Sequence, residues 1–271
     1  MPCVLAIGGL DPGGGAGLLA DARAIARAGV FATGALALLT VQSTSGLRST
    51  TVVSRAELVA QCNEVLRHQY VAVIKIGALG SQQNVNALAE LLAAHRGIPA
   101  VLDTVMIPTR GTARLLDERA TRTMRDQLLP RAALVTANAP EAEALTGRRV
   151  TRLDEIYDAA SALLDLGVPA ALVKGGHVRS AKAIDVLAIA RAEGEPRFVE
   201  LRAPRLATPP LHGGGCVLAS LVAGRLAATI EDFAVEPERV LAAAVRWSKK
   251  VHHDALRAPF DIGGDLRVIL P

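Results

Sequence analysis

Short apolar runs alternate along the chain with segments in which apolar residues recur every three or four positions. The apolar runs predict buried strands at residues 4–7, 35–41, 71–76, 100–102, 133–136 and 170–173. The segments between them predict helices, of which the clearest covers residues 85–95 and is followed by Gly97 and Pro99. Repeated alternation of strand and helix is typical of a parallel, doubly wound sheet.

Two neighbouring runs break this alternation. Residues 185–190 and 197–202 are joined through Glu193-Gly194-Glu195-Pro196, which predicts a β-hairpin at an edge of the sheet. No internal repeat, low-complexity tract or long linker interrupts the chain. The expected fold class is therefore α/β, with a doubly wound, mostly parallel sheet flanked by helices and an edge hairpin, in one domain over residues 1–271.

The composition fits this fold and argues against a nucleic-acid-binding protein. Hydrophobic residues make up 51% of the chain and aromatic residues only 3%, so Ala, Leu and Val must build the core. Such residues suit helices packed on a buried parallel sheet. The net charge is +4, but no dense basic run is interleaved with aromatic residues. A mildly positive field favours a phosphorylated small molecule as ligand.

The three cysteines, Cys3, Cys62 and Cys216, lie far apart and lack CxxC spacing. Neither a disulfide framework nor a zinc site is expected from this spacing. The N-terminus lacks the basic region of a signal peptide, and no apolar stretch reaches the ~20 residues that span a bilayer. We expect a soluble, cytoplasmic protein without a membrane partner.

One glycine-rich stretch, LHGGGCVLAS at residues 211–220, precedes a helix predicted at residues 218–228. The free N–H groups and the dipole of a helix start favour an anion, and Gly213, Gly214 and Gly215 would let that anion approach the backbone. The same field would lower the pKa of Cys216, which would make its thiolate a candidate base. The alternative is a flexible loop before a core helix that carries a buried, inert cysteine.

A second glycine-rich loop, GGLDPGGGAG at residues 8–17, joins the first predicted strand to a helix at residues 18–28. It matches neither a Walker A loop nor a dinucleotide fingerprint, but its helix start could also hold a phosphate. Polar side chains follow other predicted strands, and ligands of open parallel sheets bind at these carboxyl ends. These residues are Gln42, Asp103, Asn138 and Lys174.

Together these residues suggest an ATP-dependent kinase. The carboxylates of Asp103 and Glu141, with the Asn138 amide, are oxygen ligands of the kind that Mg²⁺ prefers. Lys174 could neutralise phosphate charge, and Cys216 could deprotonate the acceptor hydroxyl. Taken alone, Glu141 is equally explained by a helix start and Lys174 by a solvated charge.

The sequence resembles the hydroxymethylpyrimidine and phosphomethylpyrimidine kinases of thiamine biosynthesis, within the ribokinase-like superfamily. The matching segments occur in family order over most of the chain: GGLDPGGGAGLLAD, LLTVQST, KIGALG, VLDTVM, TANAPEAEAL, VKGGH and HGGGC. The resemblance implies phosphorylation of a pyrimidine alcohol and then of its monophosphate, with ATP and Mg²⁺ as cofactors, by a homodimer.

The resemblance also implies roles for particular residues. The pyrimidine pocket would be lined by Gly9, Ala16, Asp21, Gln42 and Val105. The metal would be held by Asp103 and Glu141, and the nucleotide would contact Asn138, Lys174 and His212. Cys216 takes the place of the family's base, and the catalytic set is completed by Lys174, Gly213, Gly214 and Gly215.

The chain departs from the family pattern within the glycine turn, in the segment after Pro209 that leads to it, and at the flap. The family usually has His-Gly-Thr-Gly-Cys, so Gly214 replaces a threonine, and its Ala-Lys-Ser-Gly flap is Pro108-Thr109-Arg110-Gly111 here. These changes leave a pyrimidine-binding sensor with weakened catalysis as one alternative. Pyridoxal or pyridoxine kinase is another, because Gln42 could address either heterocycle.

Overall fold

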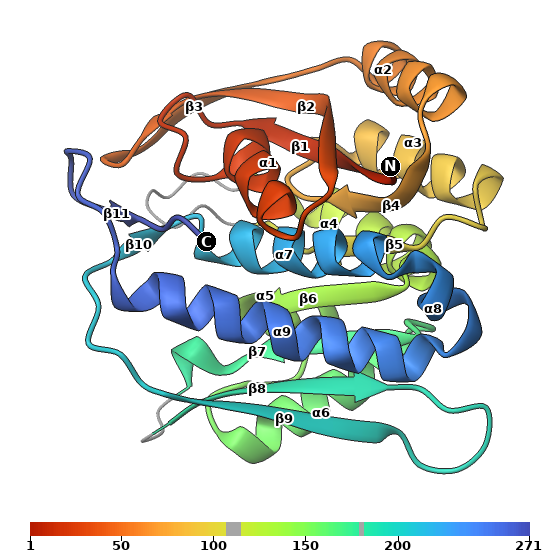
Figure 1. Cartoon of the computed structure of the whole chain (residues 1–271), viewed down its shortest axis with the longest axis vertical. Helices are drawn as coiled ribbons and strands as arrows, with labels where there is room; N and C mark the ends of the chain where they lie inside the picture. Colours follow the sequence, from red (N-terminus) through yellow and green to blue (C-terminus); the bar gives the residue numbers. More distant parts are fainter. Residues whose placement is uncertain (107–114, 179–181) are drawn as a thin grey trace.

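The computed structural model describes residues 1–106, 115–178 and 182–271. Within these residues nine strands form one sheet, shown in Figure 1. Across the sheet the strands lie in the order β3 (Gly46–Val52), β2 (Phe31–Ser43), β1 (Cys3–Leu10), β4 (Val71–Ile76), β5 (Ala100–Asp103), β6 (Leu134–Asn138), β7 (Ala170–Lys174), β8 (Lys182–Ile189) and β9 (Arg197–Pro204). Neighbouring strands from β2 to β7 pair in parallel, whereas β3, β8 and β9 pair antiparallel to their neighbours.

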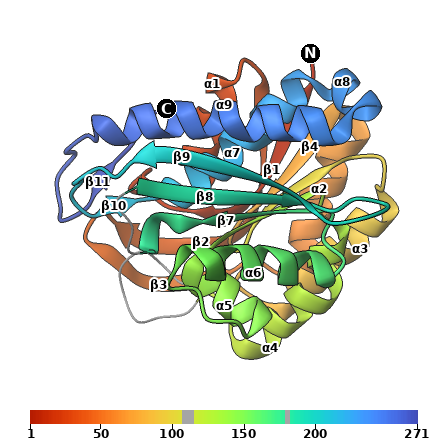
Figure 2. The same ribbon diagram turned by 90° about the horizontal axis from the view of Figure 1, so that it is seen from below.

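Helices cover both faces of the sheet, as Figure 2 shows. One face carries α1 (Gly17–Arg27), α7 (Gly214–Ala228), α8 (Ile230–Val235) and α9 (Pro237–Arg257). The other carries α2 (Arg55–His68), α3 (Gln82–Ala94), α4 (Glu118–Thr123), α5 (Ala139–Thr146) and α6 (Leu153–Asp165). A π-helical turn, Met124–Leu128, and a 3-10 turn, Leu129–Arg131, extend α4, and another 3-10 turn, Gly175–His177, follows β7.

Strand β1 shows why the apolar runs predicted the sheet correctly. Cys3, Leu5 and Ile7 pack into the core on one face, while Val4 and Ala6 pack into the core on the other. A strand that is buried on both faces needs apolar residues at successive positions, so its sequence is a continuous apolar run. The α/β fold class and the edge hairpin, β8 with β9, are both confirmed.

The structure differs from the sequence prediction around β2. The strand predicted at residues 35–41 extends over 13 residues, and the polar segment after it turns into the antiparallel strand β3. Five of the seven β3 residues are exposed. A strand that buries neither face lacks the apolar alternation on which such predictions depend.

Two C-terminal features were also missed. The 21-residue helix α9 packs on α7, and a short parallel pair joins β10 (Leu211–His212) to β11 (Arg267–Val268). The residues after α9 thereby return to the carboxyl edge of the sheet, where the Leu266 N–H donates to the Thr44 carbonyl over 3.0 Å. Among the helices that the structure describes, none combines the length and apolar character of a membrane span.

Candidate active site

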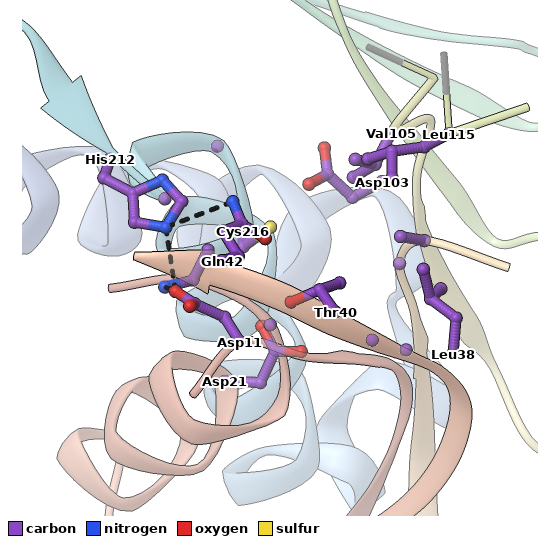
Figure 3. Close-up of a pocket in the computed structure, with 18 of the residues that line it drawn as sticks. Asp11, Asp21, Leu38, Thr40, Gln42, Asp103, Val105, Leu115, His212 and Cys216 are labelled. Atoms are coloured by element: carbon purple, nitrogen blue, oxygen red, sulfur yellow. Dashed lines mark hydrogen bonds and ion pairs between the residues drawn. The ribbon is translucent and has the colours of Figure 1, made fainter. Parts of the chain in front are cut away.

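A cavity of about 140 Å³ lies at the carboxyl ends of the parallel strands, and Figure 3 shows it in close-up. Residues at the carboxyl ends of β1, β4, β5, β6 and β7 meet there with β2 and the start of α7. The sequence-predicted site residues that line it are Gly9, Ala16, Asp21, Gln42, Asp103, Val105, Asn138, Glu141, Lys174, His212, Gly213, Gly215 and Cys216. The exception among the predicted residues is Gly214.

The start of α7 forms one wall of this cavity. Gly213 caps the helix with φ of 77°, and a Cβ on it would lie 1.9 Å from the Gly15 carbonyl oxygen, so only glycine fits. A Cβ on Gly215 would lie 3.3 Å from the Lys174 ammonium nitrogen, so this glycine lets the cation approach the first turn. The helix start therefore offers an anion both backbone N–H groups and a nearby positive charge.

Gly214 is not among the residues that line the cavity, and α9 holds it from the other side of the helix start through His252. Its carbonyl oxygen lies 2.9 Å from Nε2 of the buried His252. Burial lowers the pKa of His252 to about 4, so the neutral ring donates this hydrogen bond at neutral pH. His252 thus supports the glycine turn from behind.

The prediction of an acidic Cys216 is wrong for the ligand-free protein. Burial raises the pKa of the Cys216 thiol to about 12; the charge on Lys75 acts in the opposite direction, and Asp103 and Asp21 raise the pKa further. Desolvation and two nearby carboxylates therefore outweigh the field of the helix start.

Asp103 and Lys174 form an ion pair across the cavity. Asp103 Oδ1 accepts hydrogen bonds from Lys174 Nζ over 3.0 Å and from Thr136 Oγ1 over 2.8 Å. Although burial opposes ionisation, the charges on Lys174 and Lys75 lower the pKa of Asp103. Likewise, burial favours the neutral amine of Lys174, but Asp103 and Glu141 raise its pKa. Both groups are therefore charged at neutral pH.

Glu141 both starts a helix and lines the cavity. Its Oε2 accepts from the Asn138 N–H over 2.8 Å, while the Asn138 side chain accepts from the Glu141 N–H over 2.9 Å. This reciprocal capping fixes both residues at the start of α5. Burial raises the pKa of Glu141 to about 7, so its charge at neutral pH is set by its neighbours.

His212 lies on the side of the cavity where Gln42 is, rather than beside Asn138 and Lys174. Its Nε2 is 2.8 Å from Asp11 Oδ2 and 3.4 Å from the Gln42 side-chain nitrogen, as Figure 3 shows. Asp11 was missed by the sequence prediction, although it belongs to the glycine-rich loop. Burial opposes its ionisation, but hydrogen bonds from His212 and the Ala16 N–H lower the pKa of Asp11.

Lys75 is the second residue that the sequence prediction missed. It is 1% exposed, and its Nζ donates to both carboxylate oxygens of Asp21. Asp21 was expected to contact the substrate; both of its oxygens bind this cation, and Oδ1 also accepts from Ser220 over 2.7 Å. A lysine inside the apolar run of a buried strand was the signal, because such a charge needs a partner.

The cavity contains carboxylate oxygens that could hold the predicted Mg²⁺ ion. Among the described residues no group of three or more His, Cys, Asp or Glu side chains is arranged to hold a metal ion. Asp103 and Glu141 supply two hard carboxylate ligands, a set that suits Mg²⁺ when phosphate and water oxygens complete its shell. The flap departure at Pro108, Thr109 and Arg110 lies outside the described residues.

The comparisons with known proteins agree on one family. The family model for phosphomethylpyrimidine kinase matches residues 11–268. The hydroxymethylpyrimidine/phosphomethylpyrimidine kinase of Haemophilus influenzae is 36% identical over 261 residues, which cover 96% of this chain and 93% of the relative. The thiamine biosynthesis bifunctional protein ThiED of Geobacter sulfurreducens is 34% identical over 248 residues, and the chain spans only 49% of its length.

The fold is shared with solved structures. An ADP complex of Bacillus subtilis pyridoxal kinase superposes with a TM-score of 0.86 at 24% identity, covering 99% of this chain and 97% of that one. At this identity the likeness shows the ribokinase-like fold alone.

Proposed function

The chain belongs to the phosphomethylpyrimidine kinase family, a family of phosphotransferases, and from this membership we propose its substrates and mechanism. The proposed reaction transfers a phosphoryl group from ATP to 4-amino-5-hydroxymethyl-2-methylpyrimidine and then to its monophosphate, in thiamine biosynthesis. The observation that carries this proposal is that Gln42 and the glycine-rich start of α7 line one and the same cavity.

The heterocycle would bind at the end of the cavity that Gln42 lines. Gln42 offers an amide whose donor and acceptor suit an aminopyrimidine edge. Leu38, Val105 and Leu115 lie across the cavity from Gln42 (Figure 3) and would offer the ring an apolar wall. Gly9 and Ala16 leave room for the ring because they carry little or no side chain. Asp21 would hold Lys75 in the cavity wall through their ion pair and would not contact the ring itself.

The phosphates would bind against the start of α7, at Gly213 and Gly215. The first-turn N–H groups of α7 and the Lys174 ammonium would hold the transferring phosphoryl group, and Asn138 would contact the nucleotide. Asp103 and Glu141 would hold Mg²⁺ directly or through water. The ion, when bound, would neutralise phosphate charge.

Cys216 would accept the proton of the substrate hydroxyl. The hydroxyl oxygen would bond to the terminal phosphorus of ATP while the phosphorus–oxygen bond to ADP breaks and the proton passes to the thiolate sulfur. With a pKa of about 12, the thiolate is a minor form of the ligand-free protein. The charge on Lys75 favours this reactive form.

The test is ADP release with three acceptors: the hydroxymethylpyrimidine, its monophosphate and pyridoxal. We expect the first two to be phosphorylated with higher kcat/KM than pyridoxal. A higher kcat/KM for pyridoxal would contradict the proposed substrate. Calorimetric binding of the pyrimidine without any ADP release would indicate a sensor.

The homodimer implied by the family resemblance is also a proposal. Three aliphatic side chains on the β2–β3 extension, Leu39, Val41 and Val52, are 41–57% exposed. Light scattering after size exclusion tests the assembly, and a mass near 28.2 kDa at working concentration would contradict it.

A further inference from the structure

His212 is held in one orientation by elements far apart in the sequence. It belongs to β10, which pairs with β11 near the end of the chain, and it is 2% exposed. A Cβ on Gly15 would lie 2.4 Å from the ring carbon Cδ2, so the glycine-rich loop packs tightly against the imidazole. The ring nitrogens therefore keep fixed surroundings.

The surroundings of the two nitrogens differ. Nε2 faces the Asp11 carboxylate at 2.8 Å, and the same oxygen, Oδ2, also accepts from the Ala16 N–H over 2.9 Å. Nδ1 is buried without a hydrogen-bond partner among the described residues. A hydrogen on Nδ1 would be an unpaired buried donor, whereas one on Nε2 has a carboxylate to receive it. His212 therefore carries its hydrogen on Nε2.

This assignment decides the orientation of the Gln42 amide. The atom of Gln42 that lies 3.4 Å from His212 Nε2 cannot be an NH₂ group, because two donors would face each other. Exchanging the amide oxygen and nitrogen leaves the shape of the side chain unchanged. The oxygen then accepts from Nε2–H, and the NH₂ group lies on the branch away from His212.

We propose that Asp11 and His212 are positioning residues that turn the Gln42 NH₂ group toward the heterocycle, so that the site selects a ring with an in-plane acceptor nitrogen. The inference rests on the proposed function for the identity of the ring. It assigns His212 to substrate selection and adds Asp11, which had no role from the sequence. Neither side chain takes part in the transfer itself.

The tautomer is measured directly by nitrogen NMR of the full chain labelled in its histidines. His212, identified by loss of its signals in His212→Gln, is expected to carry a hydrogen on Nε2. Asp11→Ala is expected to give a mixture of tautomers. A wild-type ring protonated on Nδ1 alone would overturn the proposal, whatever the enzymatic activity.

The second measurement is calorimetric binding and steady-state kinetics with the hydroxymethylpyrimidine. Asp11→Ala removes the acceptor of His212 Nε2 and of the Gly13 and Ala16 N–H groups. It should raise the Kd and KM of the pyrimidine at least about tenfold, the effect of losing the hydrogen bond from Gln42 to the ring, with kcat and the KM for ATP unchanged. Asp11→Asn keeps an acceptor at the Oδ2 position but sets its NH₂ group against the Gly13 N–H that Oδ1 accepts over 2.9 Å, so it should impair binding clearly less than Asp11→Ala. Asp117→Ala, which removes a cap of α4 outside the cavity, is the matched control.

The outcomes separate the inference from the function on which it rests. An Asp11→Asn variant as impaired as Asp11→Ala would show that the acceptor at the Oδ2 position does not set the affinity, and would overturn the proposal. Asp11→Ala with wild-type affinity would also overturn it. A wild-type protein that binds the pyrimidine with this pattern but releases no ADP would overturn the proposed kinase alone.

Discussion

Lys75 and Asp21 form an ion pair inside the protein, with the ammonium nitrogen 2.9 and 2.8 Å from the two carboxylate oxygens. The pair joins β4 to α1, and Ser220 extends it to α7. Burial favours the neutral amine, but Asp21 and other nearby anions raise the pKa of Lys75, so the lysine stays charged. The cavity wall therefore depends on a charge that is almost completely buried.

Removing one member of this pair should destabilise the protein strongly. Lys75→Met leaves Asp21 buried without its cation and should lower the free energy of unfolding by about 3–5 kcal/mol. The double variant Lys75→Met/Asp21→Leu should recover much of that loss, because no unpaired charge remains. Urea denaturation measures both. Arg55→Met, in an exposed pair, is the control and should cost no more than about 1 kcal/mol.

The glycine turn should tolerate a side chain at one position and not at its neighbour. Gly213→Ala should destabilise by at least about 2 kcal/mol, since a left-handed residue and a contact with Gly15 both oppose the Cβ. Gly214→Thr should fold, because the nearest atom to its Cβ is His252 Nε2 at 3.7 Å. Thermal unfolding compares them, and equal melting temperatures for Gly213→Ala and wild type would contradict this account.

The carboxylates of the cavity should control the metal requirement. Asp103→Asn and Glu141→Gln should each raise the Mg²⁺ concentration for half-maximal rate about tenfold, the usual effect of a lost ligand or supporting oxygen. The measurement is the Mg²⁺ dependence of ADP release. Glu57→Gln, which alters the cap of α2, should leave it unchanged. A dependence like that of wild type in both cavity variants would show that these carboxylates are structural.

Cys216 should react slowly with alkylating agents. A thiol with a pKa of about 12 is protonated below that pH, so at pH 8 roughly one molecule in ten thousand carries the thiolate. The alkylation rate of a Cys3→Ala/Cys62→Ala protein should rise about tenfold per pH unit up to pH 10. Free cysteine, the control, should level off near pH 9. A plateau of the Cys216 alkylation rate below pH 8 would contradict this account and would show that the pKa of Cys216 is low, as the helix start alone suggested.

Sequence reasoning found the helices and strands whose buried positions are apolar throughout. Strand β4 was predicted with its observed bounds because all six of its residues are buried. Helix α9 was missed although its buried residues recur at helical spacing, because Ser248 and His252 continue that face after Val245. The apolar pattern of a helix ends where its buried face becomes polar. In α9 one of these polar residues, His252, supports the glycine turn through the Gly214 carbonyl.

The site was predicted as a set of residues, but their partners were not. Strand ends placed Gln42, Asp103 and Lys174 around one cavity, since carboxyl ends of parallel strands share an edge. The contact of His212 with Asp11 joins residues 201 positions apart, and the sequence carries no local signal for it. The pKa of Cys216 likewise depends on burial and on Lys75, which come only from tertiary packing.

Turnover of the hydroxymethylpyrimidine by Cys216 variants tests the central claim most directly. ADP release is measured for wild type, Cys216→Ala and Cys216→Asp, with calorimetric binding of ATP and pyrimidine to confirm intact sites. The account predicts that Cys216→Ala loses about 10²–10⁴-fold in kcat, the usual contribution of a general base, while both ligands still bind. Cys216→Asp should retain more activity than Cys216→Ala, because a carboxylate can accept the same proton. Full activity in Cys216→Ala would contradict the account.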